Sequence, residues 1–203
     1  SNSGCFLAIP FSQCYYKYCK VILEQEVFTM NTDLLTLMET RRSVRSFKPD
    51  MIPSDVIDQI IKAGTYAATG MNRQSPIIIA VTNKEMRDRL SRMNAKIMGS
   101  DKDPFYGAPV VLIVLAKKEA PTHVYDGSLV MGNLMLAAHA LDIGSCWIHR
   151  AKEEFESPEG QKILKDLGIE GEYEGIGHCV LGYVDGEYPA THPRKDNWVY
   201  YVK

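Results

Sequence analysis

Several common signals are scarce or missing in this sequence of 203 residues. Its five cysteines form no C-x-x-C pair and show no Cys/His spacing typical of metal sites, so we expect no metal. The formal net charge of -2 provides no broad basic surface, so we expect no nucleic-acid partner. Because the short apolar run near the start is interrupted and lacks a preceding cationic segment, neither a signal peptide nor a membrane-spanning helix is expected.

The rest of the composition is that of an ordinary globular protein. Hydrophobic residues make up 45% of the chain and charged residues 24%, and the length suits one sizeable domain. Cys146 and Cys179 lie within apolar runs, and the odd number of cysteines favours buried thiols over a disulfide framework. We therefore expect a cytoplasmic protein.

Residues 1–29 differ in pattern from the rest of the chain. The first methionine is Met30, and Asn31 or Thr32 is a suitable N-cap for a helix that runs to about Arg42. We expect residues 1–29 to be an extension upstream of the natural start, and residues 30–203 to form the domain.

From Thr32 onward, helical and strand patterns alternate without repeats, which indicates an α/β or α+β fold. We expect helices from Pro53 to near Ala67 and over 83–98. Strands are predicted over 77–81, 110–115 and 179–183. The β-branched run 77–81 is typical of a strand that is buried on both faces.

The segment 129–141 is apolar or small on every side except for Asn133 and His139. Such a helix must be buried all round, either at the centre of a core or in a subunit interface, and the size of the chain favours the interface. We expect His139 to be a hydrogen-bonded core histidine, and Gly144 to be the left-handed residue that ends the helix.

A cluster of cations follows the first helix, where Arg41, Arg42 and Arg45 surround Ser43. Guanidinium groups match phosphate oxygens, so the cluster suits a phosphate monoester; the alternative is a solvated basic helix end. A second basic pair, Arg194 and Lys195, occurs near the C-terminus. If Arg194 folds back onto the same phosphate, one explanation covers both patches.

Two other segments carry polar groups suited to a ring system. Asn72 and Gln74 each offer a donor and an acceptor, which match the mixed pyrimidine edge of a flavin; alternatively, both amides cap their own turn. The backbone of the segment that contains Trp147 could present N–H groups to a bound ring, or Cys146 and Trp147 could be plain core.

In this combination and order the residues resemble the nitroreductase family of flavin-dependent oxidoreductases. The resemblance extends from about Leu34 to Arg194. It rests on six motifs in register: Arg41-Arg42-Ser43-Val44-Arg45-x-Phe47, Asn72-x-Gln74, Tyr106-Gly107-Ala108-Pro109-Val110-Val111, Asn133-Leu134-Met135-Leu136-Ala137-Ala138, Gly144-Ser145-Cys146-Trp147-Ile148 and Leu181-Gly182-Tyr183. It implies an α+β fold with a mixed sheet flanked by helices, and an intertwined homodimer that holds FMN in each interface cleft.

The resemblance also implies roles for individual residues. Phosphate binding would fall to Arg41, Ser43 and Arg194, with Arg42 beside them and Lys195 less firmly placed. Asn72 and Gln74 would address the ring from the partner subunit, and Arg45 would lie near its pyrimidine end. Backbone groups around Trp147, Ile148 and His149 would face the N5/O4 edge of the ring.

Family members usually work by ping-pong chemistry. NADH or NADPH gives hydride to FMN and leaves, and a small-molecule acceptor such as a nitroaromatic or quinone enters the same site. The chemistry would be carried by FMN, without a catalytic side chain. The sequence contains no G-x-G-x-x-G motif and does not choose between the two nicotinamides.

Three departures from the family pattern affect local contacts: Ala68-Thr69 before the loop 70–75 that contains Asn72 and Gln74 (the amide loop), Ser75 after Gln74, and His149 where glycine is common. The segment from Met98 to Tyr106 is short, so we expect an open site with Phe105 or Tyr106 as a lid aromatic. Two alternatives stay open. One is a relative with dedicated chemistry, such as dehalogenation, enone reduction or flavin fragmentation, and the other is a non-catalytic FMN-binding protein.

Overall fold

The structure, a computed structural model, describes residues 34–203, and the chain divides into two compact units, residues 1–40 and 41–203. In the first unit residues 34–40 are helical, and the apolar side chains of Leu34, Leu35 and Met38 are exposed. The expected N-cap at Asn31 or Thr32 and the extension 1–29 lie outside the described residues.

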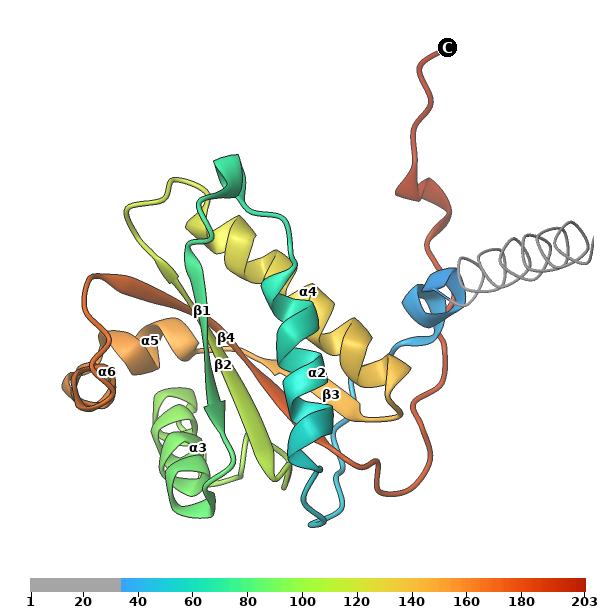
Figure 1. The fold of residues 1–203 in the computed structure, drawn as a ribbon. Coiled ribbons are helices and arrows are strands. Elements are labelled where there is room, and N and C mark those ends of the chain that lie inside the picture. The colour runs from blue at the N-terminus through green and yellow to red at the C-terminus, as the bar shows by residue number, and fades with distance from the viewer. Residues whose placement is uncertain (1–33) are drawn as a thin grey trace, which may run out of the picture. The chain divides into compact units, whose positions relative to one another are not determined.

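The second unit is built around a four-stranded antiparallel sheet with helices on both faces (Figure 1). Its strand order is β1-β2-β4-β3, with bounds β1 (Pro76–Val81), β2 (Val110–Lys117), β3 (Gly144–Ile148) and β4 (Tyr173–Gly182). An isolated parallel bridge joins Ser43 to Ser145 on β3, at the edge of the sheet. The α+β fold predicted from the sequence is confirmed, but the resemblance implied a mixed sheet, and the strand pairs of this sheet are all antiparallel.

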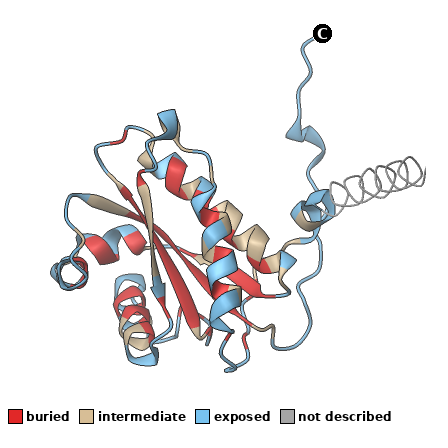
Figure 2. Ribbon diagram, viewed as in Figure 1, coloured by how far each residue is buried: buried red, intermediate tan, exposed pale blue. Residues whose placement is uncertain are grey.

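The strand β2 is buried along nearly its whole length (Figure 2). Its side chains alternate between two hydrophobic cores, one on each face of the sheet. Val111, Ile113 and Leu115 enter one core, and Val110, Leu112 and Val114 enter the other. This is the period of two expected of a strand. Because both faces are covered, seven of the eight residues of β2 are buried, as the apolar run predicted.

The matching expectation for β1 is met only in part. Ile77 and Ile79 pack against one core and Ile78 against the other, so both faces are covered, but β1 lies at the edge of the sheet and most of its residues are half-buried. A β-branched run indicates the tendency to form a strand, but the position of the strand in the sheet depends on which neighbours cover it.

One core is covered by α2 (Ser54–Thr65) and α4 (His123–Ala140), and the other by α3 (Lys84–Met98), α5 (Ala151–Glu156) and α6 (Pro158–Asp166). The helix expected from Pro53 is confirmed as α2, with Ile57 and Ile60 buried, although Pro53 precedes the helix as its N-cap instead of beginning it. The helix α3 begins at the cap residue Asn83, whose side-chain oxygen accepts a hydrogen bond from the backbone N–H of Met86 at 2.9 Å.

The helix α4 is buried on one side only, where Val130, Met131, Leu134 and Ala138 meet the sheet. Leu129 on the other side is half exposed, so burial all round is not achieved within the described chain, and the interface stays a prediction. The helix leads into a left-handed residue at Asp142 (φ 57°), not at Gly144. Gly144 instead begins β3, where an added Cβ would lie 3.0 Å from Val184 and 3.2 Å from the ring of Phe47. No described helix is both long enough and apolar enough to cross a membrane.

Candidate functional site

The arginine cluster lies in an extended segment (the arginine segment, residues 41–48) that pairs first with β3 and then with the residues that follow β4. The backbone N–H of Val44 donates to the carbonyl of Ser145 at 2.9 Å, and that of Lys48 donates to Tyr183 at 2.9 Å. Val44 and Phe47 are buried, so the segment is anchored by backbone pairing and by apolar side chains. Because Arg41 and Arg42 are only partly exposed, the solvated helix end does not describe them.

The two adjacent arginines differ in their partners. Arg42 uses its backbone N–H to reach the hydroxyl of Tyr188 at 2.7 Å, and its side chain donates to the hydroxyl of Thr191 and to the carbonyl of Arg41. In Arg41 the nitrogen Nη1 is buried and has no hydrogen-bond partner among the described residues. A buried donor without a partner costs about 1–3 kcal/mol, so this position is suited to an external anion.

The positive charge of the cluster affects the pKa values of two neighbouring side chains, His139 and Cys146. Burial lowers the pKa of His139, and the charges of Arg41 and Arg42 lower it further against the opposing effect of Asp142. Burial raises the pKa of the Cys146 thiol, although Arg45, a hydrogen bond from Ser43 and the charge of Arg41 oppose that rise. Arg41 and Arg42 therefore act at the end of α4, and Arg41 and Arg45 act at β3.

The two cysteines that the structure describes are free and buried. Burial raises the pKa of Cys179 as well as that of Cys146, so both thiols stay protonated at neutral pH and neither is activated as a nucleophile. Within residues 34–203, no group of three or more His, Cys, Asp or Glu side chains is arranged to hold a metal ion.

The C-terminal tail returns to the cluster. Tyr188 contacts Arg42 and stacks on His139, with 5.5 Å between ring centroids and its hydroxyl 3.2 Å from Nδ1. His139 is thus hydrogen-bonded, as expected, but it is half-buried and lies outside the two hydrophobic cores. Beyond this contact, Arg194 donates to the carbonyl of His192 at 3.0 Å, and Lys195 lies over the ring of Trp198 in η2 (Asp196–Trp198). The tail is tethered beside Arg42, and phosphate contact by Arg194 stays a prediction.

The turn after β3 is held by a residue that sequence reasoning missed. Ile148 is buried, Trp147 is half-buried against Gly177, and His149 is exposed. On α3, Asn94 donates to the carbonyl of His149 at 2.8 Å and accepts from Nε of Arg150 at 2.9 Å. Because the pairs are 55 and 56 residues apart in sequence, no local signal indicates them.

The amide loop lies at the other end of α4. It begins with the short helix η1 (Gly70–Asn72), and Nε2 of Gln74 donates to Oδ1 of Asn72 at 3.3 Å. Gly70 contacts Asp126 in the first turn of α4, whereas Arg41 acts on His139 near its end. At a rise of about 1.5 Å per residue, helix positions 126 and 139 are ~20 Å apart. One subunit therefore does not bring Asn72 and Gln74 to Arg41.

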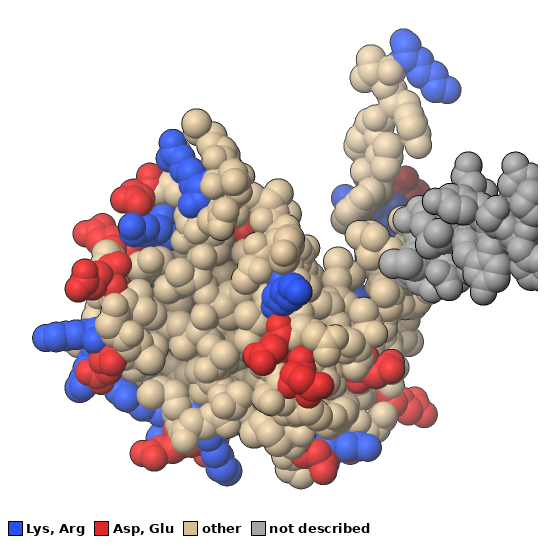
Figure 3. Space-filling view, in the orientation of Figure 1, with Lys and Arg blue, Asp and Glu red and all other residues tan. Residues whose placement is uncertain are grey.

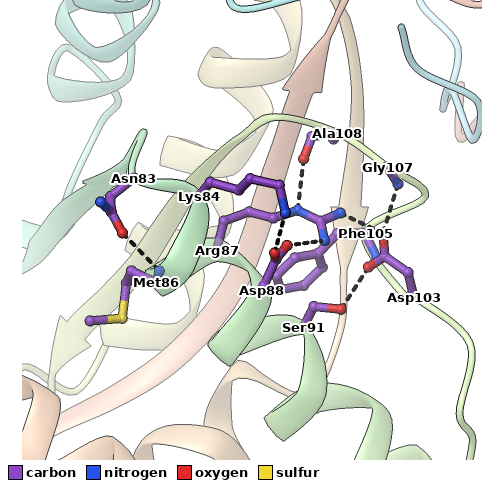
Figure 4. Close-up of polar contacts among 10 residues, drawn as sticks. All are labelled: Asn83, Lys84, Met86, Arg87, Asp88, Ser91, Asp103, Phe105, Gly107 and Ala108. Carbon is purple, nitrogen blue, oxygen red and sulfur yellow. Dashed lines mark hydrogen bonds and ion pairs between the residues drawn. The ribbon is translucent and has the colours of Figure 1, made fainter. Parts of the chain in front are cut away.

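The segment expected to provide a lid, residues 103–107, is a turn held by hydrogen bonds to Asp103 (the pinned turn; Figure 4). The carboxylate of Asp103 accepts from Ser91, from Arg87 and from the backbone N–H groups of Phe105 and Gly107. Phe105 is completely buried, with its ring 5.2 Å from that of His178, so it has no surface to offer a substrate. Tyr106 is 40% exposed, and the lid role stays a prediction for Tyr106 alone.

The pinned turn predicts a dependence of stability on acid pH. Burial raises the pKa of Asp103, but the hydrogen bonds from Arg87, Ser91, Phe105 and Gly107 outweigh it and hold the pKa below its ordinary value of 3.8. The stabilisation is complete above that value and is lost as pH falls through the lower pKa of the folded state. Urea unfolding from about pH 5 downward should give a steeper loss of unfolding free energy for the wild type than for Asp103→Asn. Equal slopes would show that this carboxylate is not stabilised in its ionised form.

Comparison with known proteins places the whole arrangement in context. The sequence profile of the nitroreductase family matches residues 38–183. A protein of Archaeoglobus fulgidus that carries the provisional name NADH dehydrogenase/NAD(P)H nitroreductase is 30% identical over 159 residues, which are 76% of this chain and 87% of that protein. An iodotyrosine deiodinase of Thermotoga neapolitana is 24% identical over 188 residues, which are 83% of this chain and 97% of that protein.

The similarity extends to solved structures. The crystal structure of a nitroreductase with bound FMN from Bacteroides fragilis superimposes with a TM-score of 0.77 at 28% sequence identity, covering 84% of this chain and 98% of that one. The profile match includes the arginine segment, the amide loop and β3. The chain belongs to the nitroreductase family.

Proposed function

We propose that this chain is an FMN-dependent oxidoreductase that passes hydride from NADH or NADPH to FMN and then to a nitroaromatic, quinone or related acceptor. The observation that carries the proposal is the buried, unpartnered Nη1 of Arg41, which lies in the same extended segment as Ser43 and Arg45. A phosphate ester supplies the acceptor that this nitrogen lacks within the described chain. The bound FMN of the Bacteroides fragilis relative supports the same group.

The residues divide the work of holding FMN. Arg41 and Ser43 would bind the phosphate, with Arg194 brought to it by the tail that is tethered at Tyr188. Arg42 is committed to Tyr188 and Thr191, so its part is to fix the tail beside the phosphate. Lys195 would add positive potential nearby.

The remaining contacts concern the ring. FMN supplies the two-electron chemistry when bound. Arg45 would place positive charge at the pyrimidine end, and Asn72 and Gln74 would match its donors and acceptors. The backbone of Trp147, Ile148 and His149 would face the N5/O4 edge, in a turn that Asn94 holds fixed.

A homodimer would bring together the two halves of the site, the arginine segment and the amide loop, which lie far apart in one subunit. The surface over α4 carries few charges in Figure 3, whereas charged side chains lie over α2. The helix α4 exposes Tyr125 and Leu129, and Tyr66 and Met71 are exposed after α2 and in η1. Exposed apolar surface of this kind is typical of an interface. If two copies of α4 pack antiparallel across a two-fold axis, the amide loop of one subunit lies beside the arginine segment of the other.

The absorption spectrum of the purified, FMN-reconstituted protein tests the proposal. We expect a yellow dimer whose flavin absorbance at ~450 nm bleaches under anaerobic conditions on addition of NADH or NADPH and returns on addition of an acceptor. A yellow protein that neither nicotinamide reduces would favour the non-catalytic alternative. A colourless monomer that does not retain FMN would refute the proposal.

A second candidate, reductive dehalogenation, is favoured by the match to an iodotyrosine deiodinase over 97% of its length. An acceptor panel separates the two activities. Rapid reoxidation by a nitroaromatic or quinone, with slow reoxidation by an iodinated phenol, supports the first candidate, and the reverse order supports the second.

A further inference from the structure

Asp126 in the first turn of α4 holds both ends of the amide loop with one carboxylate. Its Oδ1 accepts from the backbone N–H of Gly70 at 3.0 Å, and its Oδ2 accepts from the hydroxyl of Ser75 at 2.9 Å. The hydroxyl of Thr122, just before the helix, donates to Oδ2 at 3.1 Å. Asp126 is 2% exposed; its hydrogen bond with Ser75 is buried, and those with Gly70 and Thr122 are partly buried.

Between these two anchors the backbone adopts a conformation that side chains disfavour. Met71, Asn72 and Gln74 have φ values of 53°, 53° and 49°, in the left-handed region where a Cβ clashes with the backbone. The backbone N–H of Gln74 is held by the hydroxyl of Thr69 at 3.1 Å. At Gly70 an added Cβ would lie 2.3 Å from the hydroxyl of Thr122, so only glycine fits against the anchor.

Strained backbone persists only where its surroundings determine it, and it is concentrated at functional sites. Here the determining group is a buried carboxylate whose hydrogen bonds go to the two ends of the loop and to Thr122, not to the side chains of Asn72 and Gln74. Burial raises the pKa of Asp126, but the hydrogen bonds from Gly70, Ser75 and Thr122 lower it below its ordinary value. The carboxylate is therefore ionised at neutral pH and accepts all three bonds.

We propose that Asp126 is a positioning residue that fixes the Gly70–Ser75 loop in the conformation in which Asn72 and Gln74 bind the flavin ring. The inference rests on the proposed function and adds to it a residue outside the contact set. It predicts that the apoprotein is already shaped for the ring, because preorganisation removes the cost of ordering the loop on binding.

Titration of the apoprotein with FMN, followed by quenching of flavin fluorescence, tests the role. We expect Asp126→Ala to raise the Kd for FMN about tenfold, because the freed loop must be ordered on binding. Asp126→Asn should stay within roughly threefold of the wild type, since its amide oxygen still accepts from Gly70 and its NH₂ can donate to the Ser75 hydroxyl. Asn133→Ala is the matched control, because it removes a hydrogen bond from the same helix to the carbonyl of Ala63 and leaves the loop untouched.

A coupling measurement separates positioning from general damage. In an Asn72→Ala/Gln74→Ala background, Asp126→Ala should raise the Kd by less than about twofold, because the groups that it positions are gone. Ser75→Ala is the substitute variant in case Asp126→Ala does not fold. It removes one of the two loop anchors without altering α4, and we expect it to raise the Kd for FMN roughly threefold. An unchanged Kd in Asp126→Ala and Ser75→Ala, or the same rise with and without the two amides, would overturn the inference while the wild type still binds FMN. If the wild type does not bind FMN, that result refutes the proposed function, and the role of Asp126, which rests on it, is refuted as well.

Discussion

Replacement of Arg41 by alanine should raise the Kd for FMN about 100-fold, the equivalent of losing roughly 3 kcal/mol of charge-assisted hydrogen bonding. The reason is that its buried Nη1 has no partner within the described chain, so its hydrogen-bonding capacity is available to a ligand. For the same reason the apoprotein should not lose stability. Its melting temperature, measured by circular dichroism without FMN, should be unchanged or slightly higher in Arg41→Ala.

Two variants serve as controls for this expectation. Arg89→Ala removes an arginine whose ion pair with Glu159 lies on the surface between α3 and α6, and it should leave FMN binding unchanged. Arg41→Lys keeps the charge but loses the planar fork, so its Kd should fall between those of the wild type and Arg41→Ala. Equal FMN affinity in Arg41→Ala and the wild type would remove this residue from the site.

Replacement of Glu154 by alanine should reduce the free energy of unfolding by about 3–5 kcal/mol. Glu154 and His178 are both fully buried, and Oε2 of Glu154 lies 2.9 Å from Nε2 of His178. The contact is a close approach of the two groups without the alignment of a hydrogen bond, whereas the amide of Asn94 donates to Oε2 at 2.9 Å. Loss of the carboxylate removes the group beside the buried imidazole, takes one acceptor from the Asn94 amide and leaves a cavity. Urea unfolding monitored by fluorescence measures the difference.

The double variant Glu154→Leu/His178→Leu shows which contribution dominates. A buried pair replaced by apolar side chains of similar volume is often neutral or stabilising, so the double variant should recover at least half of the loss. Asn94 keeps a partner in it, because its amide also donates to the carbonyl of His149. If the double variant loses as much unfolding free energy as the two single variants together, the loss in Glu154→Ala comes from packing and not from a buried histidine without its carboxylate neighbour.

Patterns that depend on neighbours in the sequence predicted the fold well. The helices α2 and α3 and the strand β2 follow from local periodicity and apolar runs, and the structure confirms them. The edge position of β1 and the left-handed Asp142 were not predicted, because each depends on what surrounds the segment in three dimensions.

The residues of the site likewise fall into those that local sequence predicts and those that it does not. The arginine segment, the amide loop and β3 are contiguous in sequence, so they could be predicted as separate pieces. The residues that position them could not. Asp126 is 56 residues from Gly70, Asn94 is 55 residues from His149, and Phe105 is recognised as core only through contacts with Arg87 and His178. Asp126 did leave a weak signal, as a lone acid at the start of an otherwise apolar helix.

The central claim is that the arginine segment binds a phosphate ester, and a comparison of FMN with riboflavin tests it most directly. The two ligands share the ring and differ in the phosphate, so equilibrium titration of the apoprotein with each isolates the contribution of that group. We predict that the wild type binds FMN at least about 100-fold more tightly than riboflavin, and that the difference largely disappears in Arg41→Ala. Equal affinity for the two ligands in the wild type would contradict the account.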